Sequence, residues 1–109
     1  MAYDEQLADR VRNALAARSE VVEKKMFGGI AFMVAGKMAV GVLGEDLIVR
    51  IDADDAEKAL AEDGVRAFDF TGRPSRTMVY VGPTRVADDR ELGEWVEAGA
   101  DCAASLASG

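Results

Sequence analysis

The sequence predicts a mixed α+β domain in which helices at both ends of the chain enclose an antiparallel meander of strands. Apolar residues recur every three or four positions in residues 4–18 and again after residue 88, a spacing typical of amphipathic helices. Between these segments the apolar runs are short, rich in Val, Ile and Met, and separated by Gly, as in β-hairpins. The predicted order is α-β-β-β-α-β-β-α.

The strands of the meander are predicted at residues 26–34, 37–43 and 46–51, joined by two-residue turns at Ala35-Gly36 and Gly44-Glu45. These turns set Met33 opposite Met38, Ala31 opposite Val40, Val42 opposite Leu47, Val40 opposite Val49, and Met38 opposite Ile51. Met38, Val40 and Val42 of the middle strand then lie on the same face in both hairpins, so the two predicted registers are consistent with each other. The predicted core face consists of Met33, Met38, Val40, Val42, Leu47, Val49 and Ile51.

The opposite face of this predicted meander is unusually apolar for a face in water. In this register it carries Ile30, Phe32, Val34 and Ile48, with the small residues Ala39 and Gly41 among them. Contiguous exposed apolar surface usually marks a contact site. These four large residues are therefore the predicted interface.

After the meander, the aspartates of residues 52–55 are suited to cap a short helix through residue 62, and Gly64 is expected to end it. Extended runs follow at residues 65–70 and 77–81, with a loop at 71–74 between them. Asp88 or Asp89 is expected to cap the last helix, whose apolar stripe includes Leu92, Trp95 and Val96.

Length and charge limit the classes of function. The 109 residues fit one domain, 1–109, and the net charge of -7 disfavours direct binding to nucleic acid or to an anionic membrane. A single cysteine, no apolar run long enough to span a bilayer and no secretory signal favour the cytoplasm. With no His, the chain is expected to hold no metal and no cofactor.

The sequence contains no obvious catalytic residues. Cys102 has no His to act as its base, so no catalytic residue is predicted. One basic stretch, residues 66–85, carries four arginines against Asp69 in a chain that is otherwise acidic. An anion could bind there, but pairing of the arginines with the acidic helices on either side is the favoured interpretation. The four arginines are Arg66, Arg73, Arg76 and Arg85.

Two stretches carry a family resemblance: residues 25–33, Lys-Met-Phe-Gly-Gly-Ile-Ala-Phe-Met, and residues 68–74, Phe-Asp-Phe-Thr-Gly-Arg-Pro, followed by Met78-Val79-Tyr80-Val81. Together with residues 47–50 and the closing helix, they resemble the N-terminal domain of the TfoX/Sxy family. The resemblance implies a two-layer α+β domain, similar to secretion-chaperone-like folds. It also implies a role in transcription regulation, because founding members control natural competence with a cyclic-AMP receptor protein. Those longer proteins carry a second, C-terminal domain that is expected to be missing here.

Two hypotheses follow. The first is a non-enzymatic interaction or regulatory domain that binds a protein partner, or itself as a homodimer, through Ile30, Phe32, Val34 and Ile48. The alternative is a small-molecule or anion-binding protein or enzyme with a site between the segments 27–29 and 71–74. That site would be lined by Phe27, Gly28, Gly29, Gly72 and Arg73, with Arg73 holding an anionic group. The first hypothesis is favoured because the second lacks a base, a nucleophile and a metal site.

Overall fold

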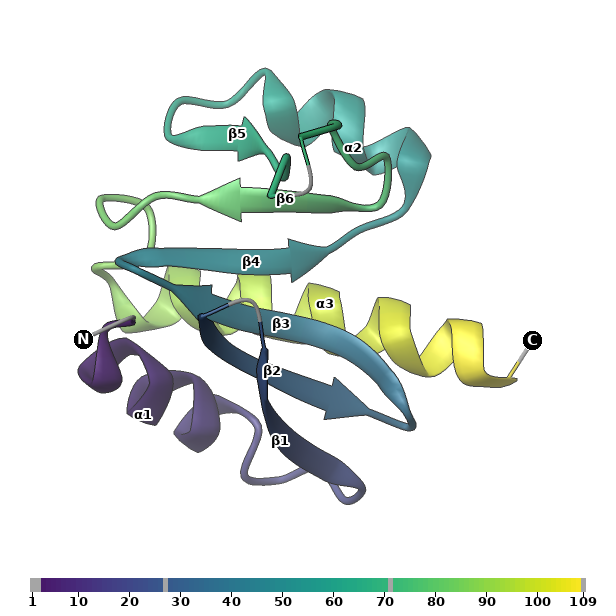
Figure 1. The fold of residues 1–109 in the computed structure, drawn as a ribbon. Helices are drawn as coiled ribbons and strands as arrows, with labels where there is room; N and C mark the ends of the chain where they lie inside the picture. The colour runs from purple at the N-terminus through teal and green to yellow at the C-terminus, as the bar shows by residue number, and fades with distance from the viewer. Residues whose placement is uncertain (1–2, 27, 71, 109) are drawn as a thin grey trace.

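A computed structural model describes residues 3–26, 28–70 and 72–108, and Figure 1 shows its fold. The described residues form three helices and six strands. The helices are α1 (Glu5–Ala14), α2 (Ala53–Leu60) and α3 (Asp89–Ser108). The strands are β1 (Val21–Met26), β2 (Gly29–Val34), β3 (Lys37–Leu43), β4 (Asp46–Arg50), β5 (Val65–Ala67) and β6 (Met78–Val81). Within these ranges, no helix has the length and apolar composition needed to cross a bilayer.

The strands form one sheet in the order β1-β2-β3-β4-β6-β5, and all neighbouring strands are antiparallel. The predicted α+β class and the arrangement of its elements are confirmed. The structure adds one strand, β1, ahead of the three-strand meander. Its sequence, Val-Val-Glu-Lys-Lys-Met, lacks a regular alternation of apolar and polar residues, because an edge strand is largely exposed.

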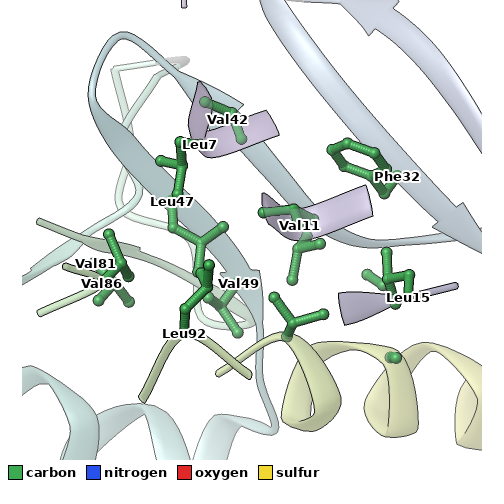
Figure 2. Close-up of a cluster of buried hydrophobic side chains, with 14 of the residues drawn as sticks. Leu7, Val11, Leu15, Phe32, Val42, Leu47, Val49, Val81, Val86 and Leu92 are labelled. Atoms are coloured by element: carbon green, nitrogen blue, oxygen red, sulfur yellow. The ribbon is translucent and has the colours of Figure 1, made fainter. Parts of the chain in front are cut away.

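All three helices pack against the same face of the sheet. The main core contains Leu7 and Val11 of α1, Ala59 of α2, and Leu92 and Val96 of α3. In Figure 2, side chains of α1 and α3, among them Leu7, Val11 and Leu92, lie in one cluster with the strand residues Phe32, Leu47 and Val49. A second apolar cluster, on the opposite face of the sheet, contains no helical residue.

Helix caps fix two of the three helix starts. The Asp4 carboxylate accepts hydrogen bonds from the backbone N–H groups of Gln6 and Leu7, at 2.9 and 3.2 Å. The Asp88 carboxylate accepts one from the N–H of Glu91 at 3.0 Å, as an N-terminal cap should. Asp52 is the N-cap of α2, but its side chain makes no capping hydrogen bond.

A β-bulge in the first hairpin corrects the predicted register. The turn at Ala35-Gly36 forms as predicted, with positive φ at both residues, and Met33 lies opposite Met38. Beyond this pair the register shifts by one residue, so that Phe32, and not Ala31, lies opposite Val40. The additional residue on β3 is Ala39.

The second hairpin has the predicted register, with Val40 opposite Val49 and Val42 opposite Leu47. The predicted pair of Met38 and Ile51 does not form, because β4 ends at Arg50. The N–H of Ile51 donates to the carbonyl oxygen of Thr77, which continues the pairing of β4 with β6. The Nε of Arg50 donates to the carbonyl oxygen of Met38.

The bulge exchanges the two faces of β2 relative to the prediction. A shift of one residue turns every following side chain to the other side of a strand. The predicted interface residues Ile30, Phe32 and Val34 are therefore in the main core, between 0 and 4% exposed, and the prediction was wrong for them. Met33 and Met38, predicted in the core, lie on the opposite face together with Ile48. Val40, Val42, Leu47 and Val49 are in the core as predicted.

Helix α3 rests on the bulge at Gly99. A Cβ atom at Gly99 would lie 2.4 Å from the carbonyl oxygen of Ala39 and 2.8 Å from Cγ1 of Val40. Neither distance is compatible with a side chain, and the first contact is with backbone, which cannot rotate away. Glycine at this position therefore sets how closely α3 approaches the sheet.

We expect Gly99→Ala to lower the free energy of unfolding by about 1–3 kcal/mol, because the added methyl group forces α3 away from β3. Gly93→Ala is the matched control, since Gly93 lies in the same helix and a methyl group added there would have no atom within 4 Å. The control should gain up to about 1 kcal/mol from helix propensity. Urea unfolding curves measure both, and equal stability of the two variants would contradict the contact.

The register also predicts opposite results for two adjacent residues. Phe32→Lys should cost about 3–5 kcal/mol or prevent folding, because it removes a fully buried ring and buries a charge. Met33→Lys should change stability by about 1 kcal/mol or less, because this side chain is partly exposed on the other face. Circular dichroism with urea unfolding distinguishes them. A folded Phe32→Lys beside an unfolded Met33→Lys would contradict the assigned faces.

Candidate functional site

The face of the sheet opposite the helices carries a continuous apolar cluster, which we call the methionine face. Its buried members are Ala31, Met38, Ile48 and Tyr80, and Met26, Met33, Leu43, Phe68 and Met78 pack against them. Four of the five methionines in the chain are in this cluster. Of the four residues predicted from the sequence to form an interface, only Ile48 lies on this face.

The methionine face is packed by its own side chains. Ala31 and Ile48 are fully buried although no helix of the described chain covers them. The Phe68 ring lies against the Tyr80 ring, with the centroids 5.0 Å apart, and burial is the main cause that raises the pKa of Tyr80. Methionine side chains are unbranched and polarizable, so such a surface can adapt its shape to a partner.

Positively charged residues border this face in a chain that is acidic overall. Lys24 lies opposite Ala31 in the register, and Arg50 lies opposite Met78. The Arg66 guanidinium lies 5.0 Å from the centroid of the Tyr80 ring and donates to Asp46 at 2.8 Å, and this hydrogen bond raises the pKa of Arg66. Asp69 also lies near Arg66 and Tyr80, so three cations and two carboxylates give these positions a net charge of +1, whereas the chain carries -7.

The four arginines of the basic stretch, residues 66–85, differ in whether they form ion pairs and with which carboxylates. Arg85 pairs with Glu62 and Glu91, both at 2.7 Å, as the favoured interpretation predicted. It also donates to the carbonyl oxygen of Asp63, and so it joins the end of α2 to the start of α3. Arg66 pairs with a strand carboxylate instead of a helix. Arg73 and Arg76 are exposed and have no ion pair within the described part of the chain.

Of the alternative site between residues 27–29 and 71–74, the structure describes residues 28–29 and 72–74. Gly28 and Gly29 line a shallow groove with Tyr3, Lys25 and Met26, and none of its lining residues comes from 72–74. Gly29 has a structural role, because a Cβ there would lie 2.2 Å from the carbonyl oxygen of Val42. Gly72 and Arg73 are exposed on the loop before β6, and Phe27 and Thr71 lie outside the described residues.

The single thiol is poorly suited to nucleophilic attack. Burial raises the pKa of Cys102, and the nearby Asp52 carboxylate raises it further. The Cys102 Sγ donates to Asp52 Oδ1 at 3.7 Å. A thiol with a raised pKa stays protonated at neutral pH, and the thiolate is the reactive form. Among the residues described, no group of three or more side chains could hold a metal ion.

Fold and surface together define a small α+β domain whose helices all pack on one face of an antiparallel sheet. Comparison with protein families gives the family itself: residues 13–103 match the TfoX N-terminal domain, and the chain belongs to this family. The family predicted from residues 25–33 and 68–74 is thereby confirmed. Comparisons with curated proteins and with solved structures gave no match.

Proposed function

We propose that this domain is a non-enzymatic interaction module that regulates a partner protein by binding it through the methionine face. The observation that carries the proposal is an apolar, methionine-rich face of the sheet that no helix of the described chain covers. The apolar surface of this face comes from its partly exposed members, Met26, Met33, Leu43, Phe68 and Met78. Contiguous apolar surface often marks a contact site, and methionine is common at binding surfaces that adapt to their partners.

The partner chemistry that fits this face is an apolar segment with acidic residues at its border. Lys24, Arg50 and Arg66 would meet such carboxylates, and electrostatic complementarity of this kind gives specificity. A second copy of the chain fits less well, because a two-fold contact through this face would bring these cations together. Nucleic acid is disfavoured by the net charge of -7.

We also propose that the domain has no catalytic activity, because its side chains offer no suitable base or nucleophile. The chain has no His, and its one thiol has a raised pKa. The carboxylates of the described helices mostly lie in ion pairs or at exposed positions. An interaction role requires none of these groups to react.

The test uses a designed helical peptide of about 18 residues with leucine on one face and glutamate on the other, and a counterpart with lysine in place of glutamate. Methyl NMR of the methionines follows binding. The acidic peptide should shift the signals of Met26, Met33 and Met78 in a saturable way. Met33→Gln and Met78→Gln should each weaken binding about fivefold or more, because they replace apolar contact area with an amide.

Leu60→Gln is the matched control, since Leu60 is an exposed apolar residue of α2, remote from this face, and it should leave binding unchanged. Three results would overturn the proposal. These are equal binding of the lysine peptide, a dimer seen by light scattering that Met33→Gln dissociates, and binding of duplex DNA that weakens with salt.

A further inference from the structure

On the helix side of the sheet, a groove of about 500 Å³ runs between α2 and α3, in the size range of small-molecule sites. We call it the α2–α3 groove. It is lined by Ile51, Asp52, Asp55, Lys58, Ala59, Glu62, Trp95, Ala98, Asp101, Cys102 and Ser105. None of these residues belongs to the methionine face, so the groove is separate from the proposed interaction surface.

The floor and one wall of the groove are apolar. Ala59 is buried in the main core, and Ile51 and Trp95 are partly buried against it. Sequence analysis placed Trp95 on the core stripe of the last helix, whereas the structure places the indole at the edge of the core, beside the groove. The indole Nε1 donates a long hydrogen bond to Glu91 at 3.4 Å, and the Arg85 guanidinium lies 5.8 Å from the centroid of the indole ring.

Carboxylates form the rim of the groove, and two of the four are neutralised from outside it. Arg85 holds Glu62 at 2.7 Å, and Arg18 holds Asp101 at 2.5 Å. Asp52 and Asp55 have no ion pair in the part of the chain that is described. Lys58 supplies the single ammonium group of the lining.

The orientation of Asp52 is unusual for its position. As the N-cap of α2 it would normally accept a hydrogen bond from the first turn of the helix. Its side chain makes no such bond and instead accepts the Cys102 thiol across the groove. A carboxylate is thus directed between the two helices instead of stabilising its own helix.

We propose that the α2–α3 groove binds a small organic cation with an apolar body, whose charged group faces Asp52 and Asp55 and whose apolar part packs against Trp95. An apolar floor contributes burial of hydrophobic surface, and the two carboxylates without an ion pair select the sign of the ligand's charge. The ligand class is opposite in charge to the anion that Arg73 was expected to hold, and the site is a different one.

Trp95 is the only tryptophan of the chain, so its fluorescence reports on the groove directly. The probes are 2-phenylethylammonium, the neutral 2-phenylethanol and the anionic 3-phenylpropanoate, which have similar size and differ in charge. The cation should change the fluorescence in a saturable way, with a Kd of about 1 mM for so small a ligand. The neutral probe should bind at least about fivefold more weakly, and the anion should not bind.

Variants then test the assigned residues. The double variant Asp52→Asn with Asp55→Asn should weaken binding of the cation about tenfold, while asparagine at position 52 still suits an N-cap. Asp54→Asn is the matched control, because it removes a carboxylate from the same helix turn that does not line the groove. Lys58→Gln should strengthen binding about twofold or more, because it removes the like charge.

The melting temperatures of all variants confirm that each is folded. Equal binding of the three probes, no saturation below about 20 mM cation, or an equal effect of Asp54→Asn and the double variant would each overturn the proposal.

Discussion

The contact between Gly99 and the bulge in β3 determines how the rest of the domain is arranged. The additional residue Ala39 lets both Ala39 and Val40 face the helices, and α3 lies over this point with no side chain between its backbone and the strand. Side chains of β2 and β3 are thereby assigned to faces: Phe32 turns inward, and Met33 and Met38 turn outward. Arg50 supports the bulge, because its Nε donates a hydrogen bond to the carbonyl oxygen of Met38.

The two faces that result differ in what holds them together. On the helix side, the buried residues are branched aliphatics, alanines and one phenylalanine, which pack tightly in few conformations. Exposed ion pairs add connections between elements, such as the two hydrogen bonds from Arg12 to Glu23 that join α1 to β1. Each such pair contributes little to stability. The other face depends on flexible methionines, which makes it the more adaptable surface of the molecule.

Sequence reasoning succeeded where one residue type or period determines the local structure. The turn at Ala35-Gly36, the register of the second hairpin, the Asp88 cap and the family all followed from such signals. The bulge could not be predicted because residues 38–43 of β3 are apolar or glycine throughout, so no polar side chain marks which face is wet. Without the bulge, the interface was placed on Ile30, Phe32 and Val34, which are core residues. The α2–α3 groove was missed because it depends on the packing of two helices distant in sequence.

The methionine face and the α2–α3 groove also differ in the charged residues that lie beside them. Cations border the methionine face, whereas Asp52 and Asp55, which have no ion pair among the described residues, lie beside the groove on the helix side. A domain built like this presents two surfaces that would select ligands of opposite charge. Both depend on the bulge, since it fixes the outward face of the meander and the position of α3.

The solvent accessibility of individual methyl groups tests most directly which side chains lie on which face of the sheet. A soluble nitroxide added to methyl-labelled protein broadens the NMR signals of groups that solvent reaches. The structure predicts strong broadening for Met26, Met33 and Met78, and little for Ile30, Val34 and Val40, which are at most 4% exposed. Broadening of Ile30 and Val34 with protection of Met33 would contradict the bulge and the methionine face together.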